Sequence, residues 1–546
     1  MTMMKIRAAY DSALLGGEPP AWAQDRQWVF LLTCYMLGGP EGRNLGAPGY
    51  SHDFVARLFR PILERWGEVI EVRDAPRHLQ ASVDECLRQG KKPIHFSVLP
   101  FQDVSLVKGA PNIVMPAWEY PDVPNESFDG NPQNDWPATA DRCDLCLVSG
   151  PFTAAALRRG GATVPIRIVP VPTPAEYFTL PARTVAEPRK VACRGYVFPP
   201  SGDAAAEATA PVLAAAPRTQ RAGKAIELAF RRTLHATLGK PAYERLSRLT
   251  KGLKPAHRRQ PAFDLPYPRV DEIELSGVVF TSIFNPDDGR KNWLDLLTGY
   301  LAALADRPDA TLVVKLIARR EKSVRKVIDA YLRCGISHRC RIVFLCDFLS
   351  DEQMLSLCRA TTFYVQATRA EGNCLPLMNY LAAGRPGISP AHSSMGDYFG
   401  DRSGLVVESH PEPAAWPHDQ RLRLRTSWGR IVWTSLRDQI QAGYHMATEQ
   451  PERYRSLSAT CRADMRAWAS CQSVARRLEA ALAETVGRQP AGQTRAAAAR
   501  PLTHADFAVQ SWPAAPLTRS NRHGTTNDPR PQGIRAVGPR RGDDRP

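Results

Sequence analysis

A carboxylate and two adjacent cations stand out in the second half of this chain. Glu371 opens the stretch EGNCLPLMNYLAAGRPGISP, and Arg290-Lys291 lies in NPDDGRKN at 285–292. Two basic side chains beside the free backbone N–H groups of a helix start can neutralise a diphosphate. A carboxylate next to another helix start likewise suits a polar ligand that carries phosphate. These residues therefore predict a phosphate-binding site, provided that the fold brings them together.

The residues around Glu371 predict a βαβ unit. Residues 361–366 are β-branched and aromatic, which is typical of a buried strand. An apolar stripe over 375–383 predicts a helix that ends at the Gly-Arg-Pro of 384–386. The next extended segment begins at 388. Glu371 then follows the carboxyl end of a strand, which is where open parallel sheets bind their ligands.

The rest of the chain alternates strands and helices in two blocks. The first block has predicted strands at 28–34, 94–99, 112–115, 145–148 and 166–169, with helices over 52–66, 79–89 and 152–159. The second has predicted strands at 273–280, 311–316 and 341–345, with helices over 293–305, 322–334 and 351–359. This alternation predicts parallel sheets with helices on both faces. Residues 416–485 read as mostly helical.

The stretch from Glu371 resembles the donor-site motif of retaining glycosyltransferases of the family 4 type. That family carries Glu-x7-Glu between a strand and a helix; the first Glu contacts the donor sugar and the second holds the ribose hydroxyls. Here Asn379 stands at the second position, and a neutral side chain makes a weaker contact. Cys374 and Leu375 lie inside the motif as implied donor contacts. The resemblance implies a GT-B fold, with two Rossmann-like, doubly wound α/β domains facing across a cleft.

Two other segments of the second block resemble parts of the same family's donor site. Arg290 and Lys291 match the element that neutralises the departing diphosphate; on their own they would read as a solvated helix end. Residues 392–398 resemble the loop beside the sugar and base pocket. There Ser394 and Met395 would contact the donor, and an ordinary turn is the alternative.

The first block carries two weaker matches to the family. Gly38 and Gly39 resemble the glycine-rich loop that lets backbone approach the donor phosphates, although any tight turn uses glycine. Glu119 lies where these enzymes place acceptor-facing or catalytic residues. Its alternative is a loop carboxylate that caps nearby N–H groups.

The resemblance implies that a sugar moves from a nucleotide diphosphate sugar to a hydroxyl acceptor with retention of configuration. Arg290 and Lys291 would stabilise the leaving diphosphate, Glu371 would position the sugar, and Glu119 would orient the acceptor. The scheme needs no metal and no cofactor besides the nucleotide sugar. The acceptor would be a glycan, a lipid-linked glycan or a protein. No Asp-x-Asp follows a predicted strand, which disfavours a metal-dependent GT-A enzyme.

The net charge of +16 is concentrated in two segments. Residues 183–269 hold 17 basic and 6 acidic side chains, and residues 487–546 hold 10 and 4. The rest of the chain is therefore close to neutral, which disfavours a specific nucleic-acid partner for the folded bodies. Residues 221–249 predict a basic amphipathic helix that can lie on an anionic membrane surface. The alternative is a helix packed on one domain.

Five regions are expected. They are an acceptor-side domain over 1–172, a Pro/Ala/Arg-rich basic insertion over 173–268, a donor domain over 269–450, helices over 451–486 that can cross back to the first domain, and a disordered basic tail over 487–546. Twelve cysteines in mostly apolar contexts, with no leading signal segment, favour reduced thiols in a cytoplasmic protein that can sit peripherally at the inner membrane face.

Two alternatives belong to other functional classes. A non-catalytic GT-B scaffold or regulatory subunit would explain Asn379, the insertion and the tail, and predicts weak or absent nucleotide-sugar binding. A basic nucleic-acid-binding protein predicts salt-sensitive binding through the insertion or the tail alone.

Overall fold

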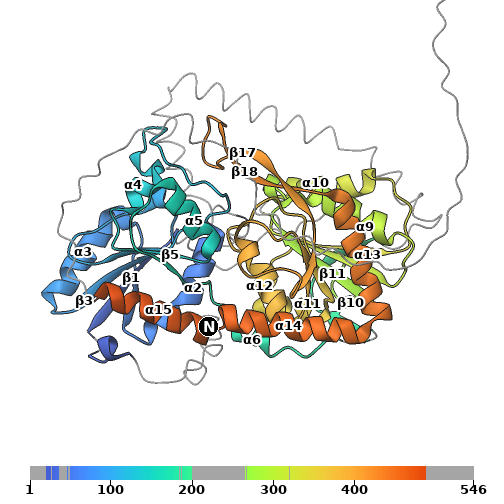
Figure 1. Cartoon of the computed structure of the whole chain (residues 1–546). Helices are drawn as coiled ribbons and strands as arrows, with labels where there is room; N and C mark the ends of the chain where they lie inside the picture. Colours follow the sequence, from blue (N-terminus) through green and yellow to red (C-terminus); the bar gives the residue numbers. More distant parts are fainter. Residues whose placement is uncertain are drawn as a thin grey trace, which may run out of the picture. The chain divides into compact units, whose positions relative to one another are not determined.

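The computed structural model describes most of the chain between residues 20 and 486. The described residues are 20–25, 27–35, 46, 49–183, 185, 187–198, 265, 267, 269–318 and 320–486. They belong to one compact unit that contains two large β-sheets (Figure 1). Gly38 and Gly39, the helix predicted over 221–249 and the tail from 487 lie outside the described residues.

The first sheet has six parallel strands in the order β2-β1-β3-β4-β5-β6. Its strands are β1 (Trp28–Thr33), β2 (Glu68–Glu71), β3 (Lys92–Ser97), β4 (Asn112–Val114), β5 (Leu145–Val148) and β6 (Ile166–Ile168). The helices around it are α2 (Tyr50–Glu64), α3 (Ala75–Arg88), α4 (Trp136–Ala140) and α5 (Pro151–Gly160), with the 3-10 turns η2 (Ala21–Ala23), η3 (Phe101–Asp103) and η4 (Pro132–Asn134).

Strand β1 shows why helices cover both faces of this sheet. Successive side chains of a strand point to opposite faces. Val29 and Leu31 are buried in the cluster that includes α3, whereas Phe30 and Leu32 are buried in the cluster that includes α2. A strand that is apolar at every position needs cover on both sides, as the uninterrupted sequence WVFLLT predicted.

The second sheet has eight strands in the order β16-β15-β14-β11-β12-β13-β8-β9. Six are parallel: β11 (Val278–Phe284), β12 (Ala310–Leu316), β13 (Arg341–Leu345), β14 (Phe363–Val365), β15 (Gly387–Ser389) and β16 (Gly404–Val406). Its helices are α9 (Trp293–Leu304), α10 (Glu321–Arg333), α11 (Asp351–Ala360) and α12 (Leu375–Ala382), with the short turns η5 (Gly289–Lys291) and η6 (Ser393–Asp397). The prediction of two Rossmann-like, doubly wound bodies is confirmed.

Part of the segment read as an insertion belongs to the second body. It forms α6 (Ala175–Phe178), β7 (Arg189–Val191) and β8 (Gly195–Phe198) before residue 199. Strand β8 pairs antiparallel with β13 and with β9 (Arg269–Val270), and β7 pairs with β10 (Ile273–Leu275). Tyr196 and Phe198 are buried in the main core of the second body. The Pro, Ala and Arg content of the whole segment conceals these short strands.

The mostly helical reading from residue 416 is wrong for its first part. β18 (Leu424–Ile431) pairs antiparallel with β17 (Ser409–Ala415) in a two-stranded hairpin. An isolated hairpin exposes many of its side chains, so it lacks the apolar run that marks a buried strand. Two prolines inside β17 further conceal it, because proline is tolerated only where a strand edge is free.

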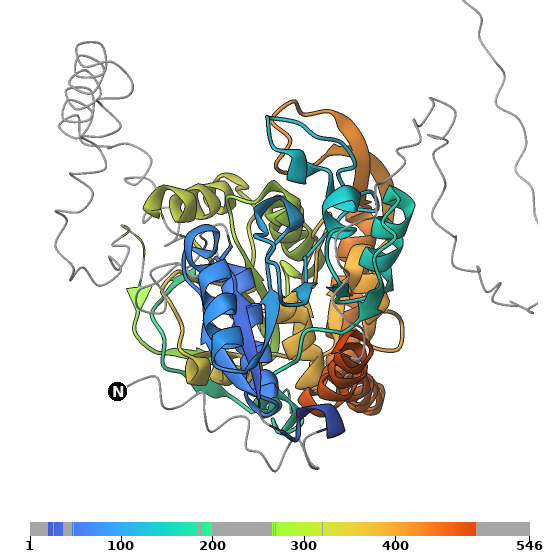
Figure 2. The same cartoon turned by 90° about the vertical axis from the view of Figure 1, so that its left-hand side faces the viewer.

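Three long helices end the described chain: α13 (Trp433–Glu449), α14 (Pro451–Ala469) and α15 (Cys471–Val486). Helix α15 returns to the first body, where Val474 and Leu478 are buried in the same cluster as Phe30. Figures 1 and 2 show this helix in red near the blue first body. The segment that leaves the first body contacts the end of α14, where Thr173 N donates to Ala469 O at 2.8 Å. Within the described ranges, no helix has the length and apolar character to cross a membrane.

Candidate functional site

The carboxyl ends of β11 and β14 carry the two loops that were predicted to bind a ligand. β11 leads into η5 with Arg290 and Lys291, and β14 leads to Glu371 just before α12. The carbonyl of Arg290 accepts hydrogen bonds from Arg369 N at 2.7 Å and from Thr368 Oγ1 at 3.2 Å. Backbone contacts thus fasten the two loops together at one edge of the sheet.

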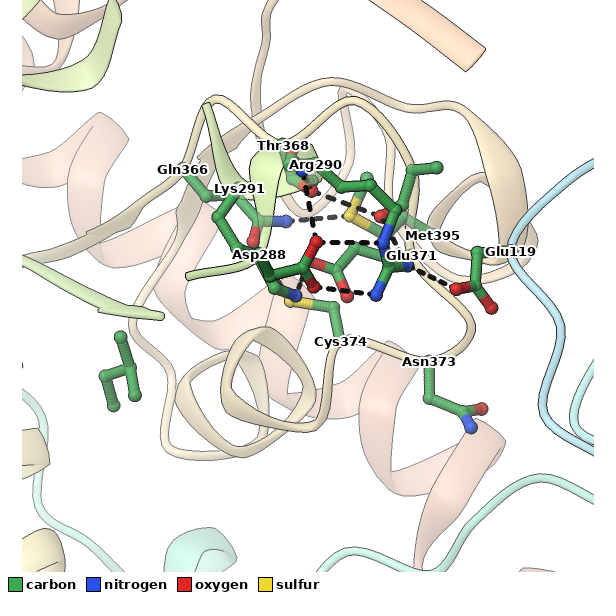
Figure 3. A network of polar contacts seen from close by, with 12 residues as sticks. Glu119, Asp288, Arg290, Lys291, Gln366, Thr368, Glu371, Asn373, Cys374 and Met395 are labelled. Carbon is green, nitrogen blue, oxygen red and sulfur yellow. Dashed lines mark hydrogen bonds and ion pairs between the residues drawn. The ribbon is translucent and has the colours of Figure 1, made fainter. Parts of the chain in front are cut away.

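Lys291 and Glu371 form an ion pair between these loops. Lys291 Nζ lies 2.6 Å from Glu371 Oε1, and the two side chains are only 19% and 9% exposed. Burial has the largest single effect and lowers the pKa of Lys291, but Glu371 and Asp288 with other nearby groups together outweigh it and raise that pKa. Figure 3 shows the pair beside Arg290 and Asp288. The amine is therefore charged and directed at the carboxylate.

Arg290 lies between carboxylates from both bodies. Its Nη1 is 2.6 Å from Glu119 Oε1, in the loop after β4 of the first body. Its Nη2 and Nε donate to the two carboxylate oxygens of Asp288 at 2.8 and 3.2 Å. In the sequence, two adjacent carboxylates beside basic residues, as at 287–288, are typical of a surface turn. The role of Asp288 could have been found from its position directly before a helical turn, where its side chain accepts from Arg290 N.

Both cations of this network already have carboxylate partners. Burial raises the pKa of Glu119, and the charge of Arg290 opposes that rise. Burial would lower the pKa of Arg290, but Glu119 and Asp288 outweigh it and raise the pKa instead. Two cations face three carboxylates, so the five side chains carry a net charge of −1 when all are ionised. A phosphate that approaches the cations therefore competes with these carboxylates.

The turn η6 holds the backbone of Glu371. Ser393 Oγ accepts from Glu371 N at 3.0 Å, and Ser394 N donates to Glu371 O at 3.3 Å. Ser394 Oγ also donates to Trp118 O at 3.3 Å, in the first body. Met395 is buried, and its sulfur accepts from Gln366 Nε2. Ser394 and Met395 thus lie in the turn that holds Glu371, and their side chains contact protein groups.

The end of η6 caps a helix of the first body. Both carboxylate oxygens of Asp397 accept from Phe152 N at 3.2 Å, in the first turn of α5. Burial raises the pKa of Asp397 to about 6, and the hydrogen bond from Phe152 N opposes the rise. This contact, together with the Ser394 bond, links the loop beside Glu371 to the first body.

The remaining motif residues lie at the start of α12 and along it. Cys374 is buried, and its thiol donates to Gln366 Oε1 at 3.0 Å. Burial raises the pKa of Cys374 to about 12, so it stays a neutral thiol. Leu375 packs against the core of the first body. Burial raises the pKa of Tyr177 on α6, and nearby Asn379 opposes that rise.

The structure brings four predicted catalytic side chains into one network: Glu371, Lys291, Arg290 and Glu119. Asn379 lies on α12 and is not part of this network, and Gly38 and Gly39 lie outside the described residues. Among the side chains that the structure describes, no three His, Cys, Asp or Glu residues gather as a metal site requires.

No protein-family profile and no curated protein matches this chain. Similar solved structures include sucrose-phosphate synthase from Thermosynechococcus elongatus, at 12% identity and a TM-score of 0.47 over 84% of this chain and 99% of that one. A glycosyltransferase from Rickettsia africae has 9% identity and a TM-score of 0.44 over 85% and 99%. HepE from Anabaena, in complex with UDP-glucose, has 10% identity and a TM-score of 0.43 over 84% and 99%. Likenesses at this level do not establish a shared activity.

Proposed function

We propose that this chain is a glycosyltransferase that moves a sugar from a nucleotide diphosphate sugar to an acceptor hydroxyl, with retention of configuration. The observation that carries the proposal is the network that joins Glu371, Lys291 and Arg290 of the second body to Glu119 of the first. It lies at the carboxyl ends of parallel strands, the usual ligand site of open α/β sheets.

Lys291 and Arg290 are the groups proposed to hold the diphosphate. Arginine presents paired N–H donors to phosphate oxygens, and lysine adds a compact point charge. Negative charge grows on the diphosphate as the bond to the sugar breaks. Fixed cations in a partly buried site stabilise that charge more than water does. Because Glu119 is held on the other body and its pKa is raised, it is the carboxylate that a donor displaces most readily.

Glu371 and Glu119 take the two remaining roles. The backbone of Glu371 is fixed by Ser393 and Ser394, so its carboxylate has a defined place from which to hold sugar hydroxyls. Glu119 would orient the acceptor hydroxyl, and a carboxylate with a raised pKa is the better proton acceptor. In this proposal no metal or cofactor takes part. A glycan, lipid-linked or protein acceptor, a place in glycan or polysaccharide synthesis, and a cytoplasmic or membrane-surface location all remain predictions.

The proposal is tested by incubating the full-length protein with nucleotide sugars, first in water alone and then with candidate acceptors. Nuclear magnetic resonance of the anomeric proton reports bond cleavage and the configuration of the product. We expect slow hydrolysis of one nucleotide sugar with a retained anomer, lost in Lys291→Met and kept in Lys322→Met, which alters an exposed lysine on α10. A product of inverted configuration would contradict retention. If no nucleotide sugar is cleaved, the proposal that this chain is a glycosyltransferase is wrong.

A non-catalytic scaffold is the second candidate. It is favoured by Asn379, which stands where the family motif has its second Glu, and by the ion pairs that Arg290 and Lys291 already make with carboxylates. A scaffold would keep these contacts permanently. It predicts a folded protein with no affinity for any nucleotide sugar.

A further inference from the structure

A second candidate site is a cavity of about 650 Å³ along α14, at the place where the chain passes between the two bodies. The residues that carry charge in its wall are all arginines, and none of the described residues that line it is acidic. The arginines are Arg183, Arg455, Arg462, Arg466 and Arg476. None of the network residues around Glu371 lines it. Arg455 pairs with Glu452, which lies outside the lining, and like charges gathered in one hollow repel one another where no counter-charge is present.

Two of these arginines are fixed by backbone carbonyls. Arg462 Nη2 donates to Leu180 O at 2.7 Å and to Ala383 O at 2.8 Å. Arg183 Nη1 donates to Glu187 O at 2.8 Å. Burial lowers the pKa of both guanidinium groups, and nearby positive charge lowers each further. The inner wall of the cavity is thus pre-organised and positively charged.

The outer wall combines exposed arginines with a helix start. Arg466 lies with its guanidinium carbon 5.1 Å from the centre of the Phe178 ring, and Arg476 is exposed on the second turn of α15. Ser470 and Ser473, at the start of this 16-residue helix, also line the cavity. The first turn of a helix presents N–H groups and the positive end of its dipole. At this helix Ser470 Oγ already accepts from Ser473 N at 3.3 Å. Charge and hydrogen-bond donors therefore converge on one space.

We propose that this cavity binds a phosphate-bearing anion, at a site separate from the network around Glu371. Guanidinium groups bind phosphate oxygens in pairs, and a helix start adds N–H donors. The volume falls within the range of roughly 300–1,000 Å³ that holds small ligands. Either a free phosphate compound or the phosphate headgroup of a lipid presents this chemistry.

Such an anion would contact both segments that connect the two bodies. Arg183 belongs to the segment that leaves the first body, and Ser473 and Arg476 belong to the helix that returns to it. A ligand held by both stabilises the folded arrangement in which they lie side by side. Binding is therefore expected to raise the melting temperature of the full-length protein as the anion concentration rises.

The experiment is calorimetric titration of the full-length protein with inorganic pyrophosphate. We compare the wild type with Arg466→Ala/Arg476→Ala and with the control Arg453→Ala/Arg430→Ala, which removes two exposed arginines outside the cavity. We expect the cavity variant to bind about 100-fold more weakly, at about tenfold for each lost charged hydrogen bond, and the control to bind like the wild type. Equal affinity in the two double variants would overturn the proposal.

Two further arms separate the sources of the signal. Lys291→Met should keep the pyrophosphate binding that Arg466→Ala/Arg476→Ala removes. Binding that is lost in Lys291→Met but kept in the cavity variant belongs to the network and overturns the proposal. Sedimentation with phosphatidylcholine vesicles, with and without phosphatidic acid, tests the lipid source. Binding to phosphatidic acid alone would identify the ligand as a lipid headgroup, and binding to pyrophosphate alone would identify it as a small anion. Either conclusion requires that Arg466→Ala/Arg476→Ala abolishes the binding. Binding to neither rejects the site.

Discussion

Glu371 and Lys291 stabilise the protein only as a pair. Both side chains are mostly buried, so removing one leaves the charge of the other without a counter-ion. The attraction between buried charges is largely offset by the cost of taking them out of water, whereas an unpaired charge bears that cost alone. Single substitutions here therefore mix loss of stability with loss of function, and the two have to be measured separately.

A double-mutant cycle measures the energetic coupling between Glu371 and Lys291. Glu371→Leu should lower the free energy of unfolding by about 3 kcal/mol, because Lys291 is left charged and unpaired. Lys291→Met/Glu371→Leu should recover most of that loss, because neither charge remains. Urea unfolding of the two single variants and the double variant measures the coupling. Losses that simply add would show that the pair does not act as a unit.

The turn η6 and the helix α5 are the elements that connect the site to the first body. Gly150 precedes α5, and a Cβ added there would lie 1.9 Å from Asp397 Oδ2. The close approach lets Asp397 reach the N–H groups at the start of α5. The position of η6, and with it Ser394, therefore depends on the absence of a side chain at residue 150.

Gly150→Ala should push these two elements apart. We expect the free energy of unfolding to fall by about 1–3 kcal/mol, which is typical of overpacking. Gly150→Ala/Asp397→Ala should be more stable than Gly150→Ala alone, because it removes the clashing carboxylate. Thermal and urea unfolding of both variants test this. A double variant that is less stable than Gly150→Ala would mean that the helix cap matters more than the clash.

The same carboxylate predicts a pH dependence. Burial raises the pKa of Asp397 to about 6 from an ordinary value of 3.8. The folded state therefore binds this proton more tightly than the unfolded state. The resulting stabilisation is complete below the unfolded pKa and is lost as the pH rises through about 6.

Asp397→Asn cannot titrate but can still accept a hydrogen bond from Phe152 N. Between about pH 4 and pH 7, the stability of the wild type should therefore fall relative to that of Asp397→Asn. Urea unfolding at several pH values gives this difference, in which contributions from other groups cancel. Parallel pH profiles for the two proteins would show that Asp397 does not titrate in this range.

The sequence predicted those parts of the site that depend on local pattern. The strand predicted over 361–366 and the helix start at 375 have strong neighbouring signals, and the structure has a strand over 363–365 and a helix that begins at 375. The pairing of Glu119 with Arg290 could be expected only from resemblance, because it joins loops of two separate sheets. The arginine cavity depends on which distant segments meet, which neither periodicity nor composition encodes. The hairpin over 409–431 is local, but its exposed side chains and two prolines conceal it.

The fold of the first body depends on the far end of the described chain. Helix α15 buries Leu478 and Leu482 in the same core as Phe30 and Ile62. The first sheet therefore lacks part of its cover until the second body has been made. This connection also keeps the two halves of the candidate site on one continuous framework.

Leu478→Ala tests this dependence. The leucine is fully buried, so its truncation should cost about 2–5 kcal/mol of folding free energy, from lost transfer energy and a cavity. Leu422→Ala is the matched control, since Leu422 is 73% exposed and should change stability by less than about 0.5 kcal/mol. Urea unfolding compares the two. A small effect of Leu478→Ala would mean that the first body does not need α15.

The most direct test of the proposed donor site is calorimetric titration of the full-length protein with UDP, GDP and their sugars. We expect one nucleotide sugar to bind, and Glu371→Gln to weaken that binding at least about tenfold through loss of a charged hydrogen bond. Glu321→Gln, at an exposed glutamate on α10, should leave it unchanged. No binding by the folded protein, or equal binding by Glu371→Gln, would contradict a donor site at Glu371 and favour the scaffold.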